Sequence, residues 1–302
     1  MLKKLPSPLK GMLNYSLLGT NTLLHSVPLL SVACLKLLPS SRWKTLCSHG
    51  LIRISENWIS LNSFFLEHTL ETQFHVYGVE ALKYEGWYMV TSNHQSWADI
   101  LVLQKNLNKK IPFLKFFLKK ELIWVPVIGL CWWALDFPFM QRFSKDLLEK
   151  HPDMKGKDLE ITKKACEKFK YTPVSIMNFL EGTRFTDSKH RQQNSPFHHL
   201  LKPKSGGAAY ALNVLSEEID TWVDITIFYP EAHKNELSFW DFMSGNCKNV
   251  VMHVKAREIP ATLKFGDYEN DPQFRQEFQG WINTLWTEKD ALLEDLSSQF
   301  SS

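Results

Sequence analysis

The sequence has little excess charge and few cysteines. Its 302 residues include 35 Lys and Arg against 32 Asp and Glu, which gives a formal net charge of +3. So mild an imbalance argues against a dedicated nucleic-acid-binding protein, which needs a strongly basic surface. The five cysteines are odd in number, widely scattered and without a Cys-x-x-Cys pair. They indicate reduced thiols in a protein that faces the cytosol and argue against a disulfide framework.

Several chemical signatures are also absent from the sequence. It contains no Gly-x-Gly-x-x-Gly fingerprint, no P-loop and no internal repeat. No serine or cysteine lies in a nucleophile-elbow setting, so nothing in the sequence predicts an acyl-enzyme. His190, His198 and His199 are clustered, but no acid or cysteine completes a recognisable metal-ligand set. The sequence therefore predicts no metal site.

Apolar and aromatic residues, in contrast, are abundant. The chain has 20 Phe and 11 Trp, which favours an apolar substrate or a membrane surface. Residues 11–35 include no Lys, Arg, Asp or Glu, and this run is long enough to span a bilayer. Polar residues and Pro28 within the run leave three interpretations: a spanning helix, a helix in the membrane interface, or a buried helix. We favour membrane contact over burial.

The remaining hydrophobic patterns predict an α/β fold. Apolar residues recur at three-to-four spacing over residues 41–72, which is typical of a helix. Later patterns alternate between strands and helices, and their order implies helices packed on a mainly parallel central sheet. Strands are predicted at 74–79, 87–90, 174–179, 221–229 and 250–259, and helices at 97–107, from 204 and from 272. The last helix, which contains Trp286, Lys289 and Asp290, is interpreted as a packing face without a catalytic role.

Residues 109–124 interleave lysines with aliphatic and aromatic side chains. This composition suits the headgroup boundary of an anionic bilayer, because apolar groups insert there while ammonium groups meet lipid phosphates. An equally weighted alternative is a core helix with a lysine edge in solvent.

Residues 91–100 contain a histidine, His94, followed five positions later by Asp99. Five positions on a regular helix turn through about 500°, so two helical side chains at this spacing would point apart. They meet only if His94 lies in the turn before the helix and Asp99 in its first turns. Asp99 would then hold one ring nitrogen and leave the other to accept a proton from a hydroxyl. Taken alone, the spacing fits better with a loop histidine and a solvated acid.

A second stretch changes that interpretation. A buried-type strand at 174–179 runs into Glu181, Gly182, Thr183 and Arg184. The two stretches together resemble motifs I and III of the glycerolipid acyltransferases, the family of 1-acylglycerol-3-phosphate acyltransferases. Motif I, Asn-His-x-x-x-x-Asp, matches completely. Motif III, Phe-Pro-Glu-Gly-Thr-Arg, matches except that Leu180 replaces proline.

Motif II of the same family matches in part. Its usual form is Gly-x-x-Phe-x-x-Arg, and this sequence has Phe139 and Arg142 at the last two defined positions. Asp136 stands where the family has glycine. The resemblance therefore extends to a third motif, but it assigns Arg142 less firmly than the residues of motifs I and III.

The resemblance implies a 1-acyl-sn-glycerol-3-phosphate O-acyltransferase or a close lysophospholipid acyltransferase of phospholipid biosynthesis. The expected partners are an acyl-CoA or acyl-ACP donor, a lysophospholipid acceptor and a phospholipid membrane, with no nucleic acid and no metal or organic cofactor. Residues 1–70 are expected to form a helical membrane-docking segment and residues 71–302 the acyltransferase domain. The expected location is the cytoplasmic face of a membrane, the inner membrane in a bacterium.

The resemblance also implies roles for individual residues. His94 is expected to deprotonate the acceptor hydroxyl as it attacks the thioester carbonyl, and Asp99 to fix the tautomer of His94. Arg184, with Arg142 and Lys204, is expected to bind the acceptor phosphate, because a guanidinium can take two phosphate oxygens at once. The expected acceptor site also includes Glu181, Gly182 and Thr183. Glu181 is acidic, so it is expected to orient Arg184 or to accept a glycerol hydroxyl.

Two rival functions use the same residues. One is a phosphatase or lipid hydrolase based on His94 and Asp99, although hydrolysis of a phosphate ester would require a metal or nucleophile that the sequence does not show. The other is a non-catalytic lipid-binding protein of the same fold. The intact His94 and Asp99 argue against it.

Overall fold

The computed structural model describes residues 2–140, 173–234 and 236–300, together with residues 160, 166 and 169. The candidate phosphate ligand Arg142 lies outside the described residues.

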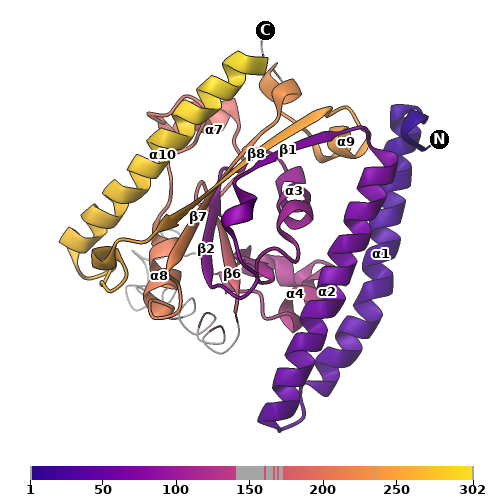
Figure 1. Ribbon diagram of the computed structural model, residues 1–302, viewed down its shortest axis with the longest axis horizontal. Coiled ribbons are helices and arrows are strands. Elements are labelled where there is room, and N and C mark those ends of the chain that lie inside the picture. The colour runs from indigo at the N-terminus through magenta and orange to yellow at the C-terminus, as the bar shows by residue number, and fades with distance from the viewer. Residues whose placement is uncertain are drawn as a thin grey trace.

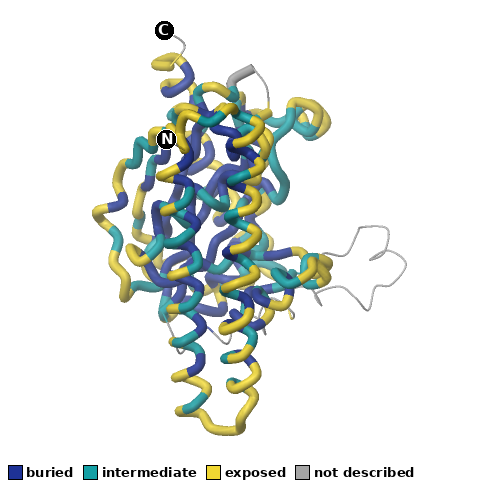
Figure 2. The backbone as a smooth tube through the Cα atoms, turned by 90° about the vertical axis from the view of Figure 1, so that its right-hand side faces the viewer, coloured by how far each residue is buried: buried dark blue, intermediate teal, exposed yellow. Residues whose placement is uncertain are grey.

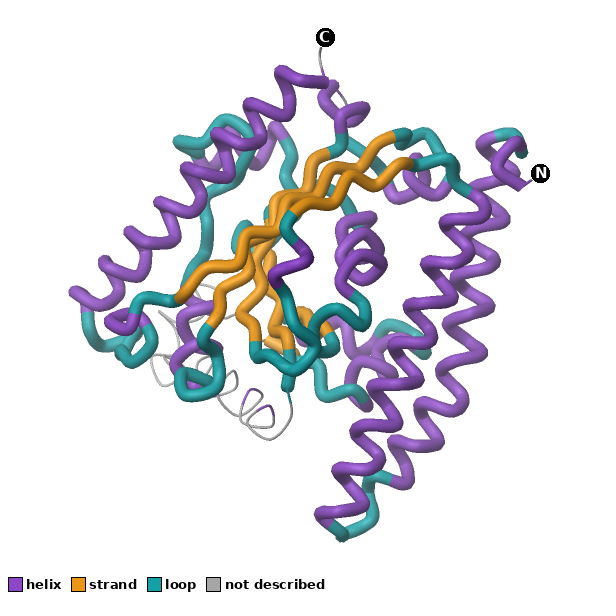
Figure 3. The backbone as a smooth tube through the Cα atoms, in the orientation of Figure 1, coloured by secondary structure: helices purple, strands orange, loops and turns teal. Residues whose placement is uncertain are grey.

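A six-stranded sheet forms the centre of the molecule (Figures 1 and 3). Its strand order is β1-β8-β7-β2-β6-β3, and the pairs β1–β8, β7–β2, β2–β6 and β6–β3 are parallel. Strand β8 runs antiparallel to β7. The strands are β1 Gln73–Tyr77, β2 Tyr88–Ser92, β3 Leu114–Phe116, β6 Ser175–Phe179, β7 Thr221–Phe228 and β8 Asn249–Glu258. The mainly parallel sheet predicted from the sequence is confirmed.

Helices cover both faces of this sheet, which explains why the central strands are apolar runs. Neighbouring residues of β2 show the division: Val90 packs with the core on one face and Met89 with the core on the other. Helices α3 and α4 lie on the first face, and α8 and α10 lie on the second (Figure 1). The helices on the sheet are α3 Ala98–Leu107, α4 Ile128–Ala134, α7 Asp187–Gln193, α8 Gly206–Val214, α9 Phe239–Met243 and α10 Pro272–Phe300.

The first 70 residues form two long helices that lie side by side, α1 Ser7–Leu35 and α2 Ser41–Thr69 (Figure 1). Asn14 fastens one end of the pair to the domain, because its side chain donates to the Met243 carbonyl at 2.7 Å and accepts from the Thr69 hydroxyl at 2.6 Å. The other end extends beyond the sheet and is largely exposed (Figure 2). The helical character predicted for residues 1–70 is confirmed.

Helix α1 is long and apolar enough to cross a membrane, by length and composition. Only 22% of the residues in its most apolar window are buried. Leu23, Leu24 and Val27 are 57%, 64% and 68% exposed. This exposure argues against the third interpretation of residues 11–35, a helix buried in the globular core.

Residues 109–124 do not form a core helix, which was one of the two equally weighted interpretations of this stretch. They form β3, the short strand β4 Leu118–Lys119 and a 3₁₀ turn Lys120–Trp124, and β4 pairs with β5 Phe139–Met140. Most of their apolar side chains are buried in the core: Ile111, Phe113, Leu114, Phe116 and Leu118. The interpretation of this stretch as a lipid-headgroup surface is therefore wrong for these side chains, because they are part of the buried hydrophobic core. Trp124, at 84% exposed, does face outward.

Candidate active site

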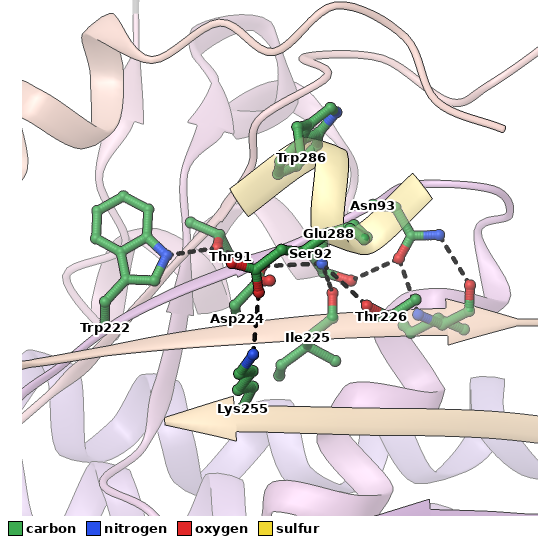
Figure 4. Close-up of polar contacts among 12 residues, drawn as sticks. Thr91, Ser92, Asn93, Trp222, Asp224, Ile225, Thr226, Lys255, Trp286 and Glu288 are labelled. Carbon is green, nitrogen blue, oxygen red and sulfur yellow. Dashed lines mark hydrogen bonds and ion pairs between the residues drawn. The ribbon is translucent and has the colours of Figure 1, made fainter. Parts of the chain in front are cut away.

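The candidate base follows directly after β2, where Asn93 continues the sheet with its side chain. The Asn93 amide donates to the Ile227 carbonyl at 2.8 Å and accepts from the Ile227 N–H at 2.8 Å. The side chain therefore takes the place of a strand neighbour beside β7 (Figure 4). Asn93 is fully buried, so the chain leaves β2 in a fixed direction and His94 enters the turn before α3.

His94 and Asp99 meet as their spacing predicts. The His94 Nδ1 lies 2.8 Å from Asp99 Oδ2, with His94 in the turn and Asp99 at the second residue of α3. The same oxygen accepts the backbone N–H groups of Gln95 at 2.8 Å and Ser96 at 3.0 Å. The other oxygen accepts the Tyr229 hydroxyl at 2.6 Å. Asp99 is fully buried, and an ionised carboxylate can accept all four bonds.

This network sets the tautomer of His94. Asp99 only accepts when ionised, so Nδ1 carries the proton and Nε2 keeps a free lone pair. Tyr229 is a neutral donor, because burial and the neighbouring Asp99 charge raise the pKa of its hydroxyl. The imidazole also stacks on Phe179, with ring centroids 3.9 Å apart and an interplanar angle of 14°. The ring is thus held at one nitrogen and on one face.

Glu181 lies beneath the histidine and faces the protein interior. Its Oε1 accepts the His94 backbone N–H at 2.7 Å, and its Oε2 accepts the Leu201 N–H at 3.0 Å. The side chain is fully buried. Burial raises the pKa of Glu181 to about 8, against the lowering effect of the two N–H groups. From the sequence we expect Glu181 to orient Arg184 or to accept a glycerol hydroxyl; in the structure both of its oxygens hold backbone N–H groups.

Gly182 allows the chain to turn back toward the histidine. Its φ of 68° lies in the left-handed region, which glycine adopts without steric cost. Three residues later, the Phe185 N–H donates to the His94 carbonyl at 2.7 Å. Motifs I and III are therefore joined by backbone hydrogen bonds.

Two of the candidate phosphate ligands, Arg184 and Lys204, lie around this turn. The Arg184 guanidinium carbon is 5.1 Å from the centroid of the Trp97 ring, and that ring also lies edge-on to His94 with centroids 6.3 Å apart. Lys189 on α7 donates to the Thr183 hydroxyl and the Arg184 carbonyl, both at 2.9 Å. Lys204 is exposed just before α8, and its backbone N–H donates to the Leu180 carbonyl at 2.7 Å.

Tyr229 and Lys189 were not among the residues singled out from the sequence. Tyr229 follows β7, the parallel neighbour of β2, so its side chain belongs at the same edge of the sheet as His94. Lys189 lies within the polar stretch after motif III. The order of the strands could therefore have pointed to Tyr229, and the position next to motif III could have pointed to Lys189.

A model of the acyltransferase family matches residues 73–234, a range that includes His94, Asp99, Glu181 and Arg184. The chain belongs to the acyltransferase family. Among curated relatives, this acyltransferase is 24% identical over 241 residues to the 2-acyl-1-lysophosphatidylinositol acyltransferase of Saccharomyces cerevisiae, covering 67% of this chain and 59% of the relative. It is 27% identical over 189 residues to the human 1-acyl-sn-glycerol-3-phosphate acyltransferase gamma, covering 60% and 45%. The acyltransferase thus spans about half the length of the curated relatives it matches.

A solved structure has the same architecture as this acyltransferase. The 1-acyl-sn-glycerophosphate acyltransferase of Thermotoga maritima superposes with a TM-score of 0.56 over 96% of this chain and 95% of its own, at 14% identity. This likeness concerns the fold: a mainly parallel sheet with flanking helices.

Proposed function

We propose that this protein transfers a fatty acyl group from a thioester, acyl-CoA or acyl-ACP, to the free hydroxyl of lysophosphatidic acid or a related lysophospholipid. The observation that carries the proposal is the 2.8 Å contact between His94 Nδ1 and a fully buried Asp99. A histidine fixed in this tautomer is a general base for a hydroxyl.

In the proposed mechanism, His94 Nε2 removes the proton from the acceptor hydroxyl as its oxygen attacks the thioester carbonyl. The imidazolium that forms is stabilised by the Asp99 carboxylate. His94 then returns the proton to the departing thiolate, so the thiol leaves and the base is regenerated. The acyl group passes directly to the acceptor, and no side chain becomes acylated.

We further propose that the acceptor phosphate binds at Arg184, with Arg142 and Lys204. Trp97 supports this because it contacts both Arg184 and His94, which puts the cation and the base on the same side of the site. Lys189 fixes Thr183 and the Arg184 backbone, so the cation is held on a braced turn. Glu181 and Gly182 contribute by shaping this turn and holding the histidine.

We propose that the α1–α2 pair contacts the cytoplasmic face of a membrane. The exposed apolar side chains of α1 support this, and so do Leu37 and Leu46 near the far end of the pair, which are 70% and 61% exposed. A lysolipid would then reach the site laterally from the bilayer.

Release of free thiol from acyl-CoA, measured with and without lysophosphatidic acid, tests the proposed function. Acceptor-dependent release together with a new diacyl product supports acyl transfer. Acceptor-independent release would mean a hydrolase. No release from acyl-CoA or acyl-ACP with several lysophospholipids would mean a lipid-binding protein and would contradict the proposal.

A further inference from the structure

Helix α10 presents buried polar side chains to the underside of the candidate site. Trp286 and Lys289 are 0% and 2% exposed, although each has a hydrogen-bonding group that burial deprives of water. The helix begins at residue 272, well beyond the residues that the acyltransferase family model matches. From the sequence we interpreted this helix as a packing face without a catalytic role. The contacts of its side chains point to more than packing.

Lys289 is fully paired inside the protein. Its ammonium lies 2.9 Å from Asp224 Oδ1, donates to the Ile225 carbonyl, and lies 3.3 Å from the Thr226 hydroxyl. Three acceptors on β7 thus match its three protons. A buried ammonium is strongly unfavourable without such partners. Burial lowers the pKa of Lys289, and the Asp224 charge opposes that shift.

Asp224 also contacts β2, the strand that leads into the turn with His94. Residues Thr91 and Asp224 are register partners on β2 and β7, and the Thr91 hydroxyl donates to Asp224 at 3.3 Å. The Trp222 indole donates in turn to the Thr91 oxygen at 3.0 Å (Figure 4). Thr91 is three residues before His94. Lys289 therefore neutralises the carboxylate that joins the two strands directly before the catalytic turn.

A second route runs through the loop at residues 198–201. The Asp290 carboxylate accepts the backbone N–H groups of His198 and His199, both at 2.8 Å. The Trp286 indole donates to the Leu201 carbonyl at 3.1 Å. Helix α10 thus holds the loop that gives the Leu201 N–H to Glu181, the same carboxylate that accepts the His94 N–H.

The charges around Glu181 come from several elements. Burial raises the pKa of Glu181, the Asp99 carboxylate on α3 raises it further, and the Lys289 ammonium on α10 lowers it, as do the backbone N–H groups of His94 and Leu201. Lys289 itself is coupled to Asp224 on β7 and to Arg257 on β8. Lys289 therefore opposes part of the rise in the Glu181 pKa that burial causes.

We propose that Lys289 and Trp286 are positioning residues for the catalytic histidine: Lys289 supplies the buried positive charge for Asp224, and Trp286 fixes the loop that completes the Glu181 contacts. This inference rests on the proposed role of His94 in acyl transfer. It predicts that α10 acts on turnover without touching either substrate.

The test compares Lys289→Met with Lys255→Met in the full-length protein. Lys255 is the matched control, because its side chain is 62% exposed and pairs with Glu288 at the surface. We expect Lys289→Met to lower kcat about 10- to 100-fold, the size of loss that follows small displacements of a catalytic group. The KM values for acyl-CoA and lysophosphatidic acid should change by less than about twofold, because positioning residues act on the reacting group and not on binding. The acidic limb of the kcat–pH profile should move to higher pH. Lys255→Met should change none of these quantities.

Two further variants separate positioning from folding. Asp224→Asn combined with Lys289→Met removes both members of the buried pair, so it leaves no uncompensated charge and should restore folding. Under the proposal its kcat stays low, because methionine cannot replace the contacts of the ammonium with the Ile225 carbonyl and the Thr226 hydroxyl. Recovery of the wild-type kcat in this double variant would overturn the proposed role of Lys289. Trp286→Phe keeps the aromatic packing but loses the indole N–H, and an unchanged kcat there would overturn the role of Trp286.

Amide hydrogen exchange gives a readout that does not depend on activity. Peptides covering residues 93–97 and 199–203 should exchange faster in Lys289→Met than in the wild type, while the β8 region should be unchanged. Faster exchange in a protein without acyl transfer would contradict the proposed function and retain the positioning role. Unchanged exchange in an active enzyme that needs His94 would contradict only the positioning role.

Discussion

Replacing Asp99 by asparagine separates the charge of this residue from its geometry. An asparagine at a histidine-orienting position commonly places its NH₂ group toward the ring and inverts the tautomer, which costs about 10⁴ in kcat in the serine-protease triad. Here the oxygen nearest to His94 also accepts the Gln95 and Ser96 backbone N–H groups. An NH₂ group in that place would face two donors. The asparagine oxygen should therefore stay on His94, with its NH₂ group toward Tyr229.

The expected loss then follows from the charge alone. A hydrogen bond to a charged group contributes about 1.5–3 kcal/mol and a neutral one about 0.5–1.5 kcal/mol, a difference of about 1–2 kcal/mol. This difference corresponds to a fall in kcat of about 5- to 30-fold. Tyr229 must rotate to accept from the NH₂ group, so Asp99→Asn combined with Tyr229→Phe should lose stability beyond the sum of the single variants.

The assay is acceptor-dependent thiol release at saturating substrates, with circular dichroism to verify that each variant is folded. A fall in kcat of about 10⁴ in folded Asp99→Asn would refute the reasoning, because it would show that the tautomer had inverted despite the two backbone donors.

Three further predictions test the phosphate site, the buried carboxylate and the membrane surface. Arg184→Ala should raise the KM for lysophosphatidic acid by about 10- to 100-fold, which corresponds to a loss of about 1.5–3 kcal/mol of binding free energy. The control is Arg275→Ala, which also removes an arginine that lies over an aromatic ring and should leave this KM unchanged. An equal rise in the KM for acyl-CoA would remove Arg184 from the phosphate site. Burial raises the pKa of Glu181 from 4.5 to about 8 in the folded state, so between these two pH values the folded state keeps a proton that the unfolded state releases. The free energy of unfolding should therefore fall by up to about 1.4 kcal/mol for each unit that the pH rises between about 4.5 and 8. Urea unfolding of Glu181→Gln should lack this slope, and equal slopes in both proteins would contradict the shift. A triple variant in which asparagine replaces Leu23, Leu24 and Val27 should be released from liposomes by high salt. The control Phe265→Asn, which also removes an exposed apolar side chain, should stay bound. Equal retention of both variants would exclude this face of α1 from membrane binding.

The sequence predicted those parts of the molecule that depend on local pattern. The His94–Asp99 contact joins residues five apart, and it was predicted from their spacing together with the second motif at residues 181–184. The mainly parallel sheet follows from the order of strands and helices. Residues 109–124 were misinterpreted because alternating lysines and phenylalanines look alike in a lipid interface and in a short strand, and only the pairing of β3 with β6 distinguishes the two.

The contacts that were missed join distant parts of the chain. Tyr229 reaches Asp99 across 130 residues, and Lys289 reaches Ile225 across 64. No local periodicity encodes such contacts, since they depend on which strands become neighbours. The direction of Glu181 was missed for a related reason: an acid that follows a strand looks the same whether it faces a ligand or two backbone N–H groups.

The central claim is that His94 is the general base for acyl transfer. The most direct test is kcat for acceptor-dependent thiol release by His94→Ala, measured beside His68→Ala, which removes an exposed histidine of α2. The account predicts that His94→Ala lowers kcat by about 10²–10⁴, the usual effect of removing a positioned base, while His68→Ala keeps the wild-type value. Near-normal turnover by folded His94→Ala would contradict it.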